Sequence, residues 1–166
     1  MKAEYINPFI AALENFCETM LGCSVERGKL KVANSALEIE HPEIDQAFAK
    51  YDISAIIGLT GKVRGTVVLS FPAKTALMIA RRFLDTEKIF KIDEIVIDAV
   101  AEMVNIVAGN AKTHLSDELG LIKLSLPTVV RGRNFEIRYP TGSIWLQIPF
   151  NSDLGPFFMQ VSFEKV

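Results

Sequence analysis

The residues DEIVIDAVAEMVNIVAGNAKTHL, Asp93–Leu115, form a helical pattern whose apolar side chains need a large surface to pack against. The apolar residues recur every three or four positions, as in a helix that turns about 100° per residue. They cover most of the helix: Val96, Ile97, Val100, Met103, Val104, Val107, Ala108, Ala111 and Leu115. The polar stripe is the remaining arc of about 100°: Glu94, Asp98, Glu102, Asn105, Gly109, Lys112 and Thr113. We therefore expect a mostly buried helix that shows solvent one narrow face.

Glu102 and Asn105 are neighbours on the polar stripe, because helical residues three apart lie on the same side. Gly109 follows one turn after Asn105. A glycine inside a helix costs about 0.5–1 kcal/mol relative to alanine, and it usually permits the close approach of another backbone. An isolated Glu-x-x-Asn is most often just a solvated face. A narrow face that carries carboxylates, an amide and a glycine instead indicates a docking edge for a partner.

The segments before this helix predict a helix, strands and a second helix. Asn7-Pro8 opens an amphipathic helix to about Leu21, since proline is favoured at the first helical position. A weak strand follows over Ser24–Val32, and Ala33–Gln46 has no clear pattern. The apolar runs Tyr51–Thr60 and Val63–Phe71 are joined by Gly61-Lys62, which indicates an antiparallel hairpin. A helix over Ala73–Leu84 completes this half of the chain.

Strands follow the long helix: Leu121–Arg131, Phe135–Tyr139, Ser143–Phe150 and Phe157–Glu164. The order of helix, strands, helix, helix, strands suggests two loosely similar halves. It predicts an α+β fold in which helices pack on one face of a largely antiparallel sheet.

Length and composition narrow the class of protein. A chain of 166 residues fits one domain, 1–166. Its net charge of −2 and scattered basic residues argue against a nucleic-acid partner. Glu4 and Glu14 interrupt the first apolar stretch, so it does not read as a signal peptide. No run of eighteen apolar residues indicates a membrane span, so we expect a cytoplasmic protein without membrane contact.

The cysteines and histidines are too few and too scattered to predict a metal site. Cys17 and Cys23 are the only cysteines, and His41 and His114 are the only histidines. A zinc site needs about four clustered ligands. Cys17 is expected to be a small buried side chain, and His114, on the apolar arc, to be buried or at the boundary.

Several separated blocks of the sequence resemble one family. Glu102–Lys112, followed by Leu126–Gly132, is similar to CheX-like members of the CheC/CheX/FliY family of chemotaxis phosphatases. Gly58–Gly65 matches that family's central hairpin, and Ser70–Leu77 matches the helix start after it. The resemblance covers most of the chain and implies a CheC-like fold. It also implies one site per chain, since the first helix has no Glu-x-x-Asn at the proper place.

The resemblance implies a partner and roles for the stripe residues. The partner is a phosphorylated CheY-like response regulator, whose aspartyl phosphate is hydrolysed. Asn105 is expected to hold the attacking water, since a carboxamide both donates and accepts hydrogen bonds and does not titrate. Glu102 is expected to pair with the lysine of the receiver's active site. Asp98 and Glu94 would extend the docking surface, and Gly109 would let the receiver backbone come close.

The same resemblance implies that the chain binds no cofactor of its own, because Mg²⁺ is supplied by the response regulator. It also implies a homodimer that pairs through sheet residues. Without such pairing, we expect apolar carboxyl-terminal strands such as Ser143–Phe150, with Trp145, to leave a sheet edge open. Two alternatives stay open from the residues. The chain could be a non-catalytic CheX-like module that docks a receiver or another signalling partner, or it could have a structural role like that of flagellar switch components.

Overall fold

The computed structural model describes residues 3–34, 51–135 and 143–166. The helical elements are η1 (Ala3–Ile6), α1 (Asn7–Thr19), α3 (Ala73–Phe83) and α4 (Glu94–Leu119). The strands of the first half are β1 (Val25–Arg27), β2 (Lys31–Asn34), β3 (Tyr51–Gly61) and β4 (Val63–Phe71). Those of the second half are β5 (Ile122–Leu124), β6 (Thr128–Phe135), β7 (Ile144–Ser152) and β8 (Gly155–Lys165).

The described strands form one antiparallel sheet in the order β1-β7-β8-β4-β3-β5, with β2 also pairing with β7 and β6 with β3. This order is symmetric about the central β4–β8 pair. The hairpin of each half receives the two other strands of the opposite half: β1 and β2 pair with β7, while β5 and β6 pair with β3. The predicted division into two similar halves is therefore confirmed, and each half completes the other's edge.

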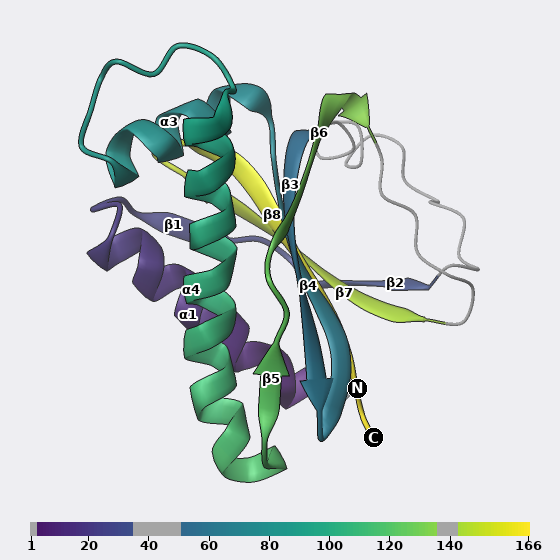
Figure 1. Cartoon of the computed structure of the whole chain (residues 1–166). Coiled ribbons are helices and arrows are strands. Elements are labelled where there is room, and N and C mark those ends of the chain that lie inside the picture. The colour runs from purple at the N-terminus through teal and green to yellow at the C-terminus, as the bar shows by residue number, and fades with distance from the viewer. Residues whose placement is uncertain (1–2, 35–50, 136–142) are drawn as a thin grey trace.

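The helices lie together on one face of the sheet, as Figure 1 shows, with α4 running along the sheet and α1 beside it. One apolar cluster fills the space between the helices and the sheet. Its largest fully buried side chains include Phe9 and Phe16 from α1, Phe71 from β4, and Phe150 and Phe157 from the β7–β8 hairpin. The predicted arrangement of helices on a largely antiparallel sheet is confirmed.

The turns and helix ends follow from local residues. Gly61 has φ +111°, and a Cβ there would lie 2.5 Å from the backbone oxygen of Leu121, so the β3–β4 turn requires glycine. Pro72 cannot cap α3 with a side chain. Asp52 of β3 does so instead, because its Oδ2 accepts a hydrogen bond of 2.8 Å from the Ala73 backbone nitrogen.

The expected open edge at Ser143–Phe150 is a wrong prediction. β7 is an interior strand, since β8 lies on one side of it and β1 and β2 lie on the other. Trp145 is accordingly buried, with 7% of its surface exposed. The predicted strand Phe135–Tyr139 lies outside the described residues except for Phe135, which ends β6. Most of Ala33–Gln46 also lies outside them.

Candidate functional site

α4 positions the predicted site on a rigid support. Asp93 caps the helix: its Oδ1 accepts hydrogen bonds of 3.0 Å from the Ile95 nitrogen and 3.3 Å from the Val96 nitrogen. The helix continues beyond the predicted Leu115 to Leu119 and ends at Gly120, whose φ is +87°. Its apolar arc is buried as predicted, except Ile97, which is half-buried.

Glu102 and Asn105 both reach the surface of α4. Glu102 is exposed and Asn105 is half-buried. Residues three apart on a helix have Cβ atoms about 5–6 Å apart, so one bound group can touch both side chains. Neither side chain has a hydrogen-bond or ion-pair partner among the described residues. The helix therefore fixes the backbone of both residues, while their side chains are free to bind another molecule.

The other predicted docking residues share this face. Glu94 and Asp98 are exposed, so three carboxylates follow one another along the amino-terminal half of the polar stripe. Gly109 is half-buried, and a Cβ added there would meet nothing within 4 Å. No packing within the described chain explains a glycine at this position. The space beside it is open.

α1, the counterpart of α4 in the first half, offers no second Glu-x-x-Asn pair. Asn15 is exposed on α1, but the position three residues before it is Ala12, which is buried. Glu14 is exposed, but Cys17 three residues later is buried. The described surface of α1 thus presents no carboxylate and carboxamide at the spacing found on α4.

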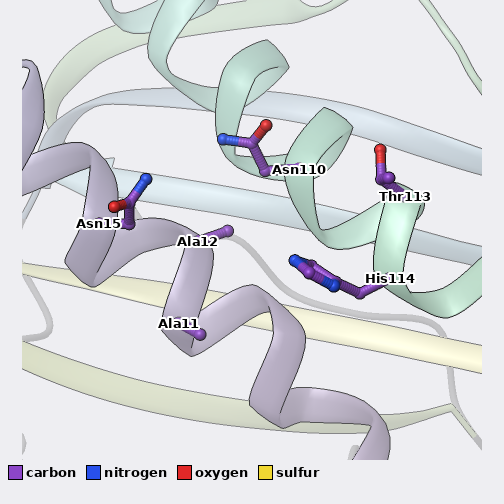
Figure 2. Close-up of a pocket in the computed structure, with 6 residues that line it drawn as sticks. All are labelled: Ala11, Ala12, Asn15, Asn110, Thr113 and His114. Atoms are coloured by element: carbon purple, nitrogen blue, oxygen red, sulfur yellow. The ribbon is translucent and has the colours of Figure 1, made fainter.

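A groove lies between α1 and the carboxyl-terminal half of α4 (Figure 2). Its volume is about 400 Å³, and its lining residues are Ala11, Ala12, Asn15, Asn110, Thr113 and His114. The polar members come from both helices, and Asn15 and Asn110 face the groove from opposite sides. The lining carries carboxamides, a hydroxyl and an imidazole but no carboxylate, which separates it chemically from the acidic part of the polar stripe.

His114 corrects the sequence interpretation, because it is exposed at this groove instead of buried or at the boundary. The physical reason is the small size of Ala11 and Ala12 on α1, which leave the imidazole uncovered (Figure 2). Cys17 is buried, as expected. Burial raises the pKa of the Cys17 thiol to about 12, and the neighbouring Cys23 thiol and Glu14 carboxylate add to the effect.

Within residues 3–34, 51–135 and 143–166, no group of three or more histidine, cysteine, aspartate or glutamate side chains is placed to hold a metal ion. In the same ranges, no helix combines the length and apolar character needed to cross a membrane.

Two exposed apolar residues at the amino-terminal end of α4 were missed by sequence reasoning. Phe90, in the α3–α4 connection, has 77% of its surface exposed, and Ile95, in the first turn of α4, has 51%. Ile95 lies seven residues before Glu102 and so on the same side of the helix. This spacing could have predicted the exposure of Ile95, because an apolar residue in line with the polar stripe does not face the core.

The architecture is shared with known proteins. A CheC-like superfamily protein from Shewanella sp. PV-4 is 32% identical and superimposes with a TM-score of 0.83, covering 99% of each chain. The CheX of a CheX–CheY–BeF₃–Mg²⁺ complex from Borrelia burgdorferi is 26% identical, with a TM-score of 0.76 over 99% of this chain and 100% of that one. The CheY-P phosphatase CheX of Thermotoga maritima is 27% identical over 138 residues, 83% of this chain and 82% of its own.

The strand exchange between the two halves, the helices on one face of the sheet and the similarity to these structures define a CheC-like protein. The family model for the chemotaxis phosphatase CheX matches residues 53–151, which include the central hairpin, α3, α4 and most of β7. The chain therefore belongs to the CheX family of chemotaxis phosphatases.

Proposed function

We propose that the chain dephosphorylates the aspartyl phosphate of a CheY-like response regulator in chemotaxis signalling. The observation that carries this proposal is the pair Glu102 and Asn105, which reaches the surface of α4 without a partner among the described residues. Two relatives support it by what they do: one is a CheY-P phosphatase and another is in complex with CheY, BeF₃ and Mg²⁺.

Asn105 acts on the water that attacks the phosphorus atom. Its carboxamide oxygen accepts a hydrogen bond from this water, and its NH₂ group can donate to a phosphoryl oxygen. The bond from phosphorus to the aspartyl oxygen breaks as the bond to water forms, which yields phosphate and the free carboxylate. Holding the water in line converts a random encounter into an oriented one, and the half-buried position of Asn105 limits its side-chain motion.

Glu102 anchors the receiver. Its exposed carboxylate is placed to pair with the lysine of the receiver's active site, and the carboxylates of Asp98 and Glu94 extend the same charge toward the start of α4. Opposite charges across an interface steer the encounter and fix its register. Mg²⁺ enters with the receiver, where it holds the phosphoryl group.

A phosphate-release assay tests this function. The chain is added to CheY-like receivers that have been phosphorylated with a small acyl phosphate, and phosphate is followed with time. Faster release than the receiver's own decay supports the proposal. Binding of the BeF₃-activated receiver without faster release would instead identify a non-catalytic docking module.

We also propose that the protein works in the cytoplasm as a homodimer, with 1–166 as one domain in each subunit. Because β7 is interior, the described edges of the sheet are β1 and β2 at one end and β5 and β6 at the other. β6 pairs only with β3 among the described strands and carries Val130 with 39% of its surface exposed. An edge of this kind is open to pairing with a second chain. It is distinct from the polar stripe of α4, so each subunit would keep its own receiver site.

A further inference from the structure

Phe90 is an exposed aromatic side chain in a connection that is anchored to the rest of the fold. Its neighbour Ile89 is buried, with 4% of its surface exposed. The Nε of Arg81, on α3, donates a hydrogen bond of 2.7 Å to the Ile89 carbonyl oxygen. Three residues after Phe90, Asp93 caps α4. The exposure of Phe90 is therefore fixed by its surroundings and does not come from a loosely attached loop.

Arg81 also orients the ring of Phe90. Its guanidinium carbon lies 5.5 Å from the ring centroid, within the range of a cation–π contact. An aromatic group held in this way loses little conformational freedom when a partner covers it, which favours binding. Burying a phenylalanine side chain stabilises a structure by about 1.5–3 kcal/mol. Within the described chain Phe90 stays exposed, so a partner that covers it would gain this free energy.

Ile95 connects this feature to the proposed active site. It lies two helical turns before Glu102, a separation of about 10 Å along the axis, and the cap by Asp93 fixes its backbone. Exposed charged residues lie next to the two apolar residues in the chain: Lys91, Glu94 and Asp98. An apolar centre with a polar rim is the usual composition of a protein–protein interface.

The distances suit a single partner. Ile95 and Asn105 are ten residues apart, or about 15 Å along α4. A standard interface buries about 800 Å² on each partner, which is wide enough to include the catalytic pair and the amino end of the helix together. A receiver docked on Glu102 and Asn105 can therefore also reach Ile95 and the connection that carries Phe90 at the amino end of α4.

We propose that Phe90 and Ile95 form an apolar anchor that selects the receiver, by packing against an apolar patch beside its phosphorylated aspartate. This inference rests on the proposed function, since it names a second part of the same docking surface. It assigns part of the affinity to the apolar anchor, in addition to Glu102, and leaves the chemistry to Asn105. Removing the anchor should therefore raise KM and Kd but leave kcat unchanged.

The test compares Phe90→Ala, Ile95→Ala and the double variant with the unaltered chain, on the CheY-like receiver of the same genome that the unaltered chain binds best. Leu121→Ala is the matched control, because Leu121 has 63% of its surface exposed just beyond the opposite end of α4. Thermal melting verifies that all variants fold. Each single variant should raise the Kd for the BeF₃-activated receiver about fivefold or more, as expected for an interface residue that contributes over 1 kcal/mol.

The outcomes separate this inference from the proposed function. Unchanged KM and Kd in the double variant, on a receiver that the unaltered chain dephosphorylates, would overturn the anchor alone. An equal effect of Leu121→Ala would also overturn it. A raised Kd in a chain that never releases phosphate would support the anchor and reject the phosphatase. Failure of the unaltered chain to bind any CheY-like receiver would reject both.

Discussion

Glu102 is exposed on α4, whereas Asn105, one turn further along the same face, is half-buried. This difference in burial suits the two tasks that we propose for these residues. A group that meets a partner first and pairs with its charge needs full access to solvent. A group that holds one water in a fixed place gains from restricted motion.

Replacing Asn105 by alanine should abolish accelerated phosphate release while leaving receiver binding nearly unchanged. Loss of a positioning group costs about 10²-fold in rate when a reacting atom is no longer held. Turnover and Kd are measured on the same receiver. Asn110→Ala is the control, since Asn110 is an exposed asparagine of the same helix that lines the groove instead. Wild-type turnover in Asn105→Ala would refute the assignment of the water to this residue.

Replacing Glu102 by lysine should weaken association itself, because the new positive charge would face the receiver's lysine. We expect the Kd for the BeF₃-activated receiver to rise about tenfold or more, which corresponds to about 1.4 kcal/mol. Glu118→Lys makes the same charge change on an exposed residue of the last turn of α4 and should have little effect. An equal affinity of Glu102→Lys and the unaltered chain would place Glu102 outside the interface.

The sequence predicts those structural elements that depend only on residues close together in the chain. The β3–β4 hairpin follows from two apolar runs around Gly61, and the buried arc of α4 follows from its period. The pairing of β2 with β7 was not visible, because residues such as Val32 and Leu146 are more than a hundred positions apart. Sequence reasoning also predicted that Glu102 and Asn105 share the polar face of one helix, which α4 confirms, while the roles assigned to them stay a prediction.

The exposed apolar residues could not be predicted in the same way. Hydrophobicity alone assigns Phe90 to the interior, and only the position of Arg81 and the burial of Ile89 show that the ring is held at the surface. His114 was misplaced because its exposure depends on the size of side chains on α1. Such errors arise wherever burial is decided by a neighbour that is distant in sequence.

The proposed homodimer predicts a molar mass of about twice the 18.4 kDa of one chain in light scattering at micromolar concentration. Because the polar stripe and the sheet edge are separate surfaces, titration with activated receiver should reach two receivers per dimer. A mass near that of one chain would reject the dimer. Saturation at one receiver per dimer would contradict the separation of the two surfaces.

Cys17 predicts a loss of stability at alkaline pH. Its pKa is raised from 9.0 to about 12 in the folded chain, so above pH 9 the unfolded chain releases this proton while the folded chain keeps it. The contribution of the thiol is thus complete below pH 9 and is lost as the pH rises toward 12, by up to about 1.4 kcal/mol per pH unit. Urea denaturation at pH 8, 9 and 10 of the unaltered chain and Cys17→Ala measures it. The difference between their unfolding free energies should shrink above pH 9, and a constant difference would contradict the expected shift.

Gly109 offers a test in which stability and function change in opposite directions. An added Cβ meets nothing within 4 Å, and alanine favours a helix interior by about 0.5–1 kcal/mol over glycine. Gly109→Ala should therefore raise the melting temperature. If the glycine is there to let the receiver backbone approach, the same methyl group should raise the Kd for the activated receiver and reduce kcat/KM. Thr113→Ala, one turn further on the same stripe, controls for a general change of the helix surface, although it also removes the hydrogen bond from its hydroxyl to the Gly109 carbonyl oxygen. A more stable variant with unchanged affinity and turnover would show that the receiver does not come close to Gly109, and the docking surface would then end at Asn105.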